Sequence, residues 1–306
     1  MKILHVVALI ASLAFVGQAQ SNSPNPQPER RTMADATYAI KGPVKFFRTE
    51  IATFVLQDGQ YVEGPRVLRD EAWFNSDGNR TDYHIYANGV LVRRIVMKFD
   101  GRKMLEAINY DGNGNAWLRR VNIFDEKGQV KEMKTYNGDG SIHSTGSWQL
   151  NSHGQVVKYA ELNAKGVLVE EIINKYEGRD LYTKERRLYD SNGSLKEETI
   201  FVAPNKQTET KFNADGSVAS KSVRVGQEMA RYGPDGSLQK ATVIDSRDRL
   251  LDEMSFRKDA ATTRQTQLPD EVDQHGNWTK QTRWFADPNG TRPLTITYRA
   301  LTYYDN

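Results

Sequence analysis

Hydrophobic and polar residues alternate along short segments of the chain, as they do in β-strands. In residues 129–136, the two sets of alternate positions hold Lys131, Met133 and Thr135, and Val130, Glu132, Lys134 and Tyr136. Successive side chains of a strand point to opposite faces of a sheet, so this segment predicts a strand with polar groups on both faces. From residue 38 onward, no segment sustains the 3.6-residue period of a helix. The pattern therefore predicts an all-β protein whose strands contact water.

A short turn phrase separates these strands. It consists of an aromatic or aliphatic residue, Asp or Asn, two variable residues, Gly, a polar residue and an apolar residue, and the complete copies are 124–130, 136–142, 189–195 and 212–218. The Asp or Asn side chain accepts hydrogen bonds from the backbone ahead of it, while the glycine takes the left-handed conformation that side chains disfavour. Each copy predicts a type I turn followed by a glycine bulge.

The spacing of the turns predicts the fold class. Counting a degenerate copy near Asp100, successive turn glycines between Gly78 and Gly166 lie 11 to 14 residues apart, which leaves roughly eight or nine strand residues between turns. This is an antiparallel meander of repeated β-hairpins, and we expect it to form an elongated, twisted open sheet or β-ribbon, of which a superhelix is one form. About fifteen strands at ~4.8 Å spacing would extend over roughly 70 Å. Open edges near Tyr38 and Tyr304 would be free to pair between molecules.

The composition favours a thin sheet over a thick globular core. Only 38% of the residues are hydrophobic, while 26% are charged. Cross-strand aromatic and Lys/Glu pairs, each contributing roughly 0.2 to 1 kcal/mol, are therefore expected to stabilise the sheet.

The first residues do not follow the repeat pattern. Residues 1–19 contain a basic start, an apolar run and small residues before Gln20, which is typical of an export signal peptide. A retained membrane anchor is the alternative, although the run is shorter than the ~20 residues that a spanning helix needs. Residues 20–37 read as a Pro-rich flexible linker, and 38–306 as one repeat domain. The chain has no cysteine and hence no disulfides. Together with the export signal, this leads us to expect a periplasmic or secreted protein. We expect no membrane span after the signal is cleaved.

Two stretches of the repeat domain depart from the pattern. Pro204 interrupts residues 199–210, and the turn phrase lapses around Pro269 in residues 255–271. Since proline cannot donate a ladder hydrogen bond, these stretches predict longer loops or bulges.

The repeated phrase resembles the YD repeat of RHS-type bacterial proteins. The likeness is carried by YDSNGSL at 189–195, by DQHGNWTK at 273–280 with LTITY at 294–298, and by KGPVK at 41–45. It covers about residues 40–306, and it implies a β-repeat shell or superhelical ribbon, which in some members presents or encloses other polypeptides. A second resemblance, to MORN-type repeats of antitoxin-like proteins, rests on YANGVL at 86–91.

Catalytic and metal-binding motifs are absent from the sequence. Of the four histidines beyond the signal segment, two lie inside turn phrases; the four are His84, His143, His153 and His275. There is no nucleophile elbow, phosphate loop, dinucleotide fingerprint or His-Glu-x-x-His. Residues 111–115 place oxygen ligands at alternate positions but lack the later Gly and Glu of a calcium loop. We therefore predict no catalytic, cofactor-binding or metal-binding residues.

Charge gives no sign of a nucleic-acid partner. The chain has 42 basic and 39 acidic residues, and they are interspersed. A nucleic-acid groove needs a stripe of one sign with stacking aromatic residues, so solvated strand faces explain these charges better.

Aromatic residues are the candidate ligand-binding groups, namely Trp117, Trp148, Trp278 and Trp284. Alternation places Trp278 and Trp284 on one strand face. In the structural interpretation, these rings cap and cover the sheet; in the functional interpretation, they stack sugars or receive side chains or a strand from a partner. The sequence thus predicts a non-enzymatic binding or scaffold protein of the bacterial cell envelope, with an envelope protein or glycan as partner. A carbohydrate-binding protein is one alternative, and an enzyme whose site is assembled from distant residues is another.

Overall fold

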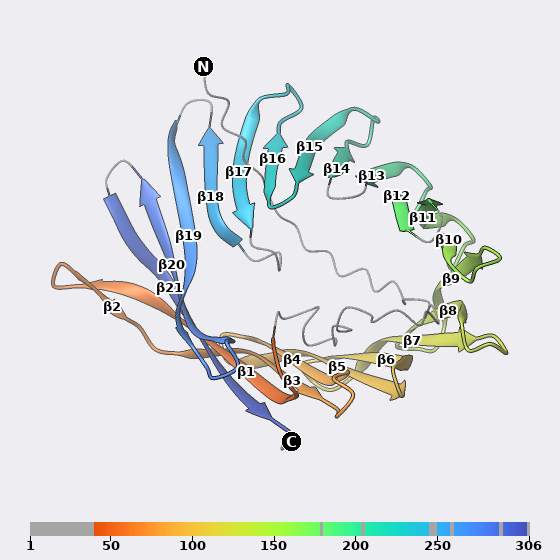
Figure 1. Cartoon of the computed structure of the whole chain (residues 1–306), viewed down its shortest axis with the longest axis horizontal. Coiled ribbons are helices and arrows are strands. Elements are labelled where there is room, and N and C mark those ends of the chain that lie inside the picture. Colours follow the sequence, from red (N-terminus) through yellow and green to blue (C-terminus); the bar gives the residue numbers. More distant parts are fainter. Residues whose placement is uncertain are drawn as a thin grey trace. The chain divides into compact units, whose positions relative to one another are not determined.

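A computed structural model describes residues 40–177, 180–202, 206–244, 250–257, 260–287 and 290–304. The predicted signal peptide (1–19) and linker (20–37) lie outside the described residues, so both stay predictions. The described chain is all-β, as the alternation predicts. It divides into two compact units: unit 1 holds residues 122–135 and 142–264, and unit 2 holds the residues before 122, 136–141 and those from 265. Figure 1 shows the strands in chain order.

The strands have the following bounds. Unit 2 contains β1 (Val44–Gln57), β2 (Gln60–Glu63), β3 (Val67–Phe74), β4 (Arg80–Ala87), β5 (Val90–Asp100), β6 (Lys103–Asp111), β20 (Trp278–Asp287) and β21 (Gly290–Tyr303). Unit 1 contains β9 (Ile142–Leu150), β10 (Val156–Asn163), β11 (Leu168–Glu177), β12 (Asp180–Tyr189), β13 (Leu195–Val202), β14 (Lys206–Phe212), β15 (Val218–Val225), β16 (Glu228–Tyr232), β17 (Leu238–Ile244) and β18 (Leu250–Arg257). Both units contribute to β7 (Ala116–Phe124), β8 (Val130–Asn137) and β19 (Ala260–Val272).

The prediction of an open sheet is wrong, because β1 and β21 pair with each other. Their antiparallel ladder runs from Val44 opposite Tyr303 to Thr53 opposite Thr295, while β3 pairs along the other edge of β1. All 21 strands belong to one hydrogen-bonded sheet. It closes into a 20-strand antiparallel β-barrel, with β2 as an additional strand on the end of β1. Closure pairs the backbone groups that an open sheet would leave at its edges.

The edge predicted at Tyr304 is accordingly not free. The Tyr304 N–H donates to the Pro43 carbonyl at 2.8 Å, and Tyr38 lies outside the described residues. The expectation of about fifteen strands is also too low, because the described residues form 21 strands. Residues 199–202 and 206–210 lie in β13 and β14, whereas Pro204 lies outside the described residues, so the prediction there is not tested. In the second stretch, β19 continues through Pro269. Pairing of β19 with β20 imposes extended backbone there although the turn phrase lapses.

The turn prediction is confirmed in atomic detail at the phrase around Asp190. The Asp190 Oδ1 atom accepts the backbone N–H groups of Asn192 and Ser194 at 2.8 and 2.9 Å. The Gly193 N–H donates to the Asp190 carbonyl at 3.0 Å, and Gly193 has a φ of 88°. A side chain at this backbone angle would be strained, which explains the glycine of the phrase.

The Asp190 carboxylate makes the stability of the protein depend on pH. Hydrogen bonds from Ser194 and Asn192 lower the pKa of Asp190, because they stabilise the charged carboxylate. The stabilisation is complete above the ordinary pKa of about 4 and is lost as pH falls through the lowered pKa. Asp190→Asn should keep the turn, since Asn163 accepts the equivalent bonds at 2.9 and 3.1 Å. We expect a smaller fall in Tm on acidification for this variant; an unchanged pH profile would contradict the assignment.

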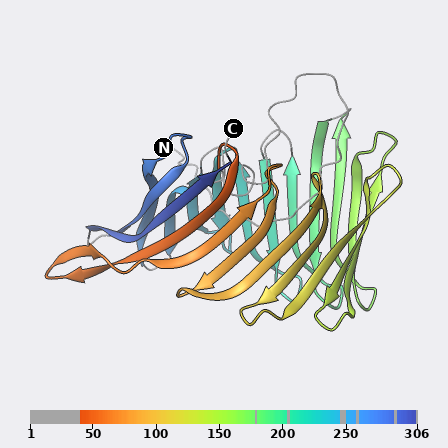
Figure 2. The same cartoon turned by 90° about the horizontal axis from the view of Figure 1, so that it is seen from below.

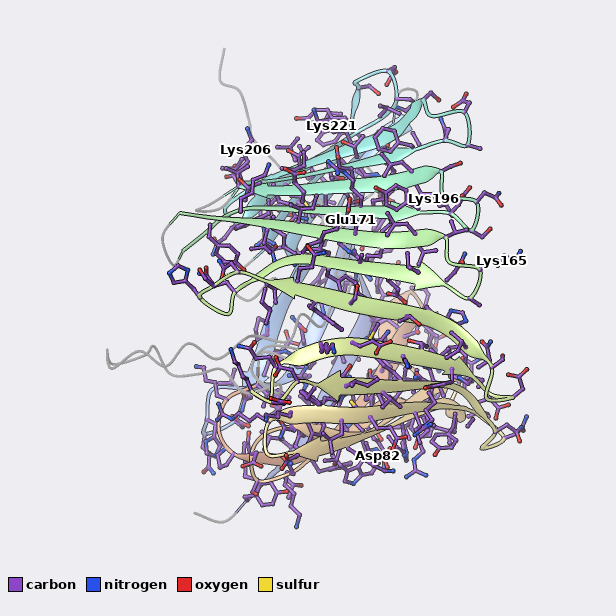
Figure 3. All side chains as sticks on the ribbon, turned by 90° about the vertical axis from the view of Figure 1, so that its right-hand side faces the viewer. Asp82, Lys165, Glu171, Lys196, Lys206 and Lys221 are labelled. Atoms are coloured by element: carbon purple, nitrogen blue, oxygen red, sulfur yellow. The ribbon has the colours of Figure 1, made fainter. Side chains whose placement is uncertain are left out.

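Cross-strand ion pairs join the strands of unit 1, as the composition predicts. The carboxylate of Glu171 lies 2.7 Å from Lys158 Nζ and 3.5 Å from Arg187 Nη1, and Arg187 Nε donates to Glu198 at 3.0 Å. Figure 3 shows Glu171 on the strand face turned toward the viewer. The opposite face carries a pair between Arg186 and Glu170 at 2.6 Å. Both faces of this part of the sheet are therefore charged.

Each unit has a small hydrophobic cluster. In unit 2 the buried members are Ile40, Val44, Phe47, Ala72 and Phe74, with Tyr83, Leu301 and Tyr303 packed against them. In unit 1 they are Met133, Tyr159 and Ile172, with Trp148 packed against them. These clusters are thin because most strand positions alternate with polar residues, so ladder hydrogen bonds and ion pairs supplement the burial of apolar surface.

Candidate functional site

The four predicted tryptophans have different environments. Trp278 is 8% exposed, and the guanidinium of Arg299 lies 3.7 Å above its ring. Trp284 is exposed on the same strand, β20, where the register shifts between Arg283 and Trp284. Trp148, in unit 1, packs on Tyr159 with ring centroids 4.8 Å apart. Trp148 and Trp278 therefore have packing roles, whereas Trp284 remains available to a ligand.

Trp117 is the other exposed tryptophan of the four, with a relative exposure of 45%. The register of β6 and β7 shifts there, since Asn109 lies opposite Leu118 and Tyr110 lies opposite Ala116. This irregularity leaves Trp117 opposite no residue of β6. The guanidinium of Arg93 lies 5.3 Å from its ring and donates to Asn109 Oδ1 at 2.5 Å. An exposed ring beside fixed polar groups is an arrangement that can stack a sugar.

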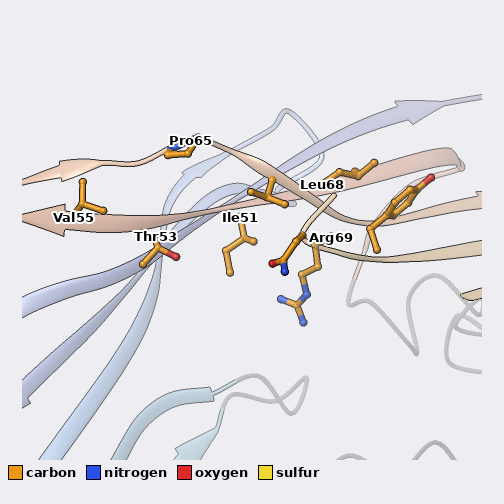
Figure 4. A pocket seen from close by; sticks show the side chains of 9 residues that line it. Ile51, Thr53, Val55, Pro65, Leu68 and Arg69 are labelled. Atoms are coloured by element: carbon orange, nitrogen blue, oxygen red, sulfur yellow. The ribbon is translucent and has the colours of Figure 1, made fainter. Parts of the chain in front are cut away.

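Unit 2 also contains a pocket that the turn pattern did not predict. It has a volume of about 290 Å³. Figure 4 shows side chains from β1 along one wall, with others from β3 and the connection that precedes it. The lining includes Ile51, Thr53, Val55, Pro65, Val67, Leu68, Arg69, Tyr86 and Asn88. Mostly apolar walls with a few polar groups are typical of a binding site for a small molecule or a side chain.

The β1–β2 hairpin extends from this pocket. Asp58 and Gly59 form its tip with φ values of 51° and 80°, the two positive angles of a type I′ turn. Figure 2 shows this hairpin in orange, reaching beyond the neighbouring strands. Its apolar side chains are exposed on both faces: Leu56 is 64% exposed, and Val55 and Tyr61 are also exposed. The sequence signal was present in residues 54–57 (FVLQ), an apolar run next to a turn that lacks the repeated phrase.

Polar contacts anchor the base of the hairpin to β21. The Tyr298 hydroxyl donates to Glu63 Oε2 at 2.6 Å, and Arg66 Nε donates to Glu63 Oε1 at 3.0 Å. The Arg66 guanidinium also lies 3.5 Å above the Tyr298 ring. The hydrogen bond from Tyr298 is the main cause that lowers the pKa of Glu63, so the carboxylate is charged at neutral pH. The hairpin is thus held at its base while its tip contacts solvent.

A second polar cluster lies on β3 and β4. The Tyr86 hydroxyl donates to Glu71 at 2.7 Å, and burial together with this bond raises the pKa of Tyr86 to about 12. His84 Nδ1 lies 3.3 Å from the Tyr86 hydroxyl, and His84 Nε2 lies 3.2 Å from Asp82. The His84 ring stacks on Trp73 with centroids 4.6 Å apart. The bond from Tyr86 to Glu71 and the stacking of His84 on Trp73 both join β4 to β3.

Within the described ranges, no three His, Asp or Glu side chains are grouped so that they could hold a metal ion. The same ranges include no helix that is long and apolar enough to cross a bilayer.

Comparisons with known proteins give weak structural likenesses. No protein-family model matches the sequence, and a search of curated proteins found no significant match. Among solved structures, a porin-like protein from Bacteroides uniformis is 12% identical with a TM-score of 0.34, covering 86% of this chain and all of the other. The TcdB2-TccC3-Cdc42 structure is 9% identical with a TM-score of 0.24, and the match covers 85% of this chain but 18% of that one. TcdB2-TccC3 without its hypervariable C-terminal region is 11% identical, also with a TM-score of 0.24.

Proposed function

We propose that this chain is an exported, non-enzymatic binding or scaffold protein of the bacterial cell envelope, and that it binds a partner at the β1–β2 hairpin and the adjoining pocket. The observation that carries the proposal is the exposure of Val55, Leu56 and Tyr61 beside an apolar pocket. Covering apolar surface is favourable by roughly 25 cal/mol per Å². Contiguous exposed apolar surface rimmed by polar residues is typical of an interaction site.

The charge distribution supports a location in water. Glu171 and Arg187 form ion pairs on one face of the unit 1 strands, and Glu170 and Arg186 form one on the other. A basic side chain that faces lipid at the middle of a bilayer costs roughly 2 to 4 kcal/mol. Both faces of these strands therefore suit an aqueous compartment, and the export signal read in residues 1–19 suits the periplasm or the secreted fraction.

Site-specific photo-crosslinking tests the binding surface. A photo-reactive residue at Leu56 in the full chain, expressed in the encoding bacterium, is expected to give a discrete crosslinked species. Val218 on β15 is the matched control, because it is also an exposed aliphatic residue, and it lies in unit 1. Crosslinks of equal yield and pattern at both positions, or none at Leu56, would refute the proposal.

Carbohydrate binding is the second candidate, favoured by the exposed Trp117 ring beside Arg93 and Asn109. If an envelope glycan is retained by the wild-type chain and lost on Trp117→Ala, while the crosslink at Leu56 is absent, the aromatic site replaces the hairpin as the binding surface.

A further inference from the structure

The ladder between β1 and β2 is a two-stranded ribbon, separate from the ladders of the main sheet. It joins Phe54 opposite Glu63 to Gln57 opposite Gln60. In a ribbon of two strands, each strand uses one edge and presents the backbone N–H and C=O groups of its other edge to solvent. A two-stranded hairpin alone is also marginally stable in water. This segment therefore gains from the addition of a third strand.

The pocket lies where such a strand would continue. Its lining combines Thr53 and Val55 of β1 with Pro65 and Val67 after β2, and with Tyr86 near the end of β4. The β4–β5 hairpin, which is the next hairpin along this side of the sheet, ends at the turn of Asn88 and Gly89. Beyond that turn, the β1–β2 ribbon has apolar side chains on both faces. Alternate apolar residues of an added strand would contact these side chains and the pocket.

An exposed arginine at the pocket indicates which charge a bound segment would carry there. Arg69 carries the only charge among the residues that line the pocket, and its side chain is 60% exposed. The nearest acidic group is Asp70, with 3.6 Å between Arg69 Nε and Asp70 Oδ2. Burial raises the pKa of Asp70, while the Arg69 side chain stays largely exposed beside it. A carboxylate from a partner would therefore find an exposed guanidinium at the pocket.

We infer that the hairpin binds an extended polypeptide segment by β-strand addition along β2, and that this segment has apolar residues at alternate positions and a carboxylate that pairs with Arg69. This inference rests on the proposed function and specifies the partner of the same site. Main-chain hydrogen bonds supply affinity in this binding mode, while pockets for alternate side chains supply specificity.

Synthetic peptides test the inference on the mature chain. The probe is a short fluorescent peptide of alternating threonine and valine that ends in aspartate; one control peptide ends in lysine amide, and another carries N-methyl groups on alternate backbone amides. Fluorescence anisotropy should show affinity at least about tenfold weaker for each control, because each loses hydrogen bonds or a charge pair. Equal affinity for the N-methylated peptide, or no binding of the aspartate peptide, would overturn strand addition.

A charge reversal tests the proposed pair between Arg69 and the carboxylate of the bound peptide. Arg69→Glu is expected to weaken the aspartate peptide by about tenfold or more and to strengthen the lysine peptide. Arg102→Glu, at the exposed β5–β6 turn, is the matched control and should leave both affinities unchanged. Equal effects of the two substitutions would overturn the role of Arg69. If Arg69→Glu fails to fold by circular dichroism, the aspartate and lysine peptides on the wild-type chain still decide the question.

The two proposals fail in different ways. A crosslink at Leu56 with no peptide binding keeps the binding surface and overturns the strand as its occupant. Peptide binding without a crosslink in the cell supports the strand chemistry and counts against the cellular binding role.

Discussion

Replacing Asn277 with alanine is expected to lower the free energy of unfolding by about 3 kcal/mol. Asn277 is 2% exposed, and its side chain joins two parts of unit 2 that are far apart in sequence. Its Oδ1 atom accepts the Lys41 N–H at 2.6 Å, and its Nδ2 atom donates to the Lys41 carbonyl at 2.9 Å and to the Tyr303 hydroxyl at 2.8 Å. Alanine would leave these partly buried groups without their partner, which costs more than the net value of the bonds.

Asn115→Ala is the matched control, because Asn115 occupies the same place in its own turn phrase. Its N–H donates to Asp111 Oδ1 at 2.9 Å, just as the Asn277 N–H donates to Asp273 Oδ1 at 2.9 Å. The Asn115 side chain is exposed, so its loss should cost less than about 0.5 kcal/mol. Urea unfolding of both variants measures the difference. Similar costs for the two substitutions would mean that Asn277 acts through its turn and not through Lys41.

The sequence predicted those features that depend on neighbouring residues. The turn at Asp190 forms from the Asp side chain, two N–H groups and Gly193, all within one phrase, so its chemistry is complete in the local sequence. Alternation between turns then predicts strands, and the interspersed charges predict cross-strand pairs such as Lys158 with Glu171.

Closure was not predictable in the same way. It depends on Phe47 lying opposite Leu301 and on Thr49 lying opposite Arg299, pairings between residues at opposite ends of the repeat domain. A repeated hairpin has the same local pattern in an open and in a closed sheet, because the number and tilt of the strands decide whether the ends meet.

The candidate site was only partly visible in the sequence for a related reason. Trp278 and Trp284 have similar strand contexts, yet the guanidinium of Arg299 covers Trp278 and leaves Trp284 exposed. The pocket needs residues from β1, β3 and the end of β4, and their meeting follows from strand pairing. Exposed rings and apolar runs can be proposed from sequence, but their environment depends on tertiary contacts.

The β6–β7 turn contains two glycines, one required by the backbone conformation and the other by packing. Gly114 has a φ of +85° with open space where a Cβ atom would lie. Gly112, two residues earlier, has an ordinary φ, but a Cβ atom there would lie 2.3 Å from the Leu91 carbonyl oxygen. Gly138 is similar, since its Cβ atom would lie 2.4 Å from the Ala116 carbonyl oxygen. In these two turns, the second glycine therefore packs against the backbone of another strand.

Gly112→Ala is accordingly expected to destabilise the protein by about 2 to 3 kcal/mol, because backbone must move to admit the methyl group. Gly114→Ala should cost only about 1 to 2 kcal/mol, the strain of a left-handed alanine. This order is the reverse of the one expected from φ alone. Urea unfolding of the two variants measures both costs under the same conditions. A larger loss for Gly114→Ala would show that the β6–β7 turn can move away from Leu91, and that positive φ is the only reason for glycine in this phrase.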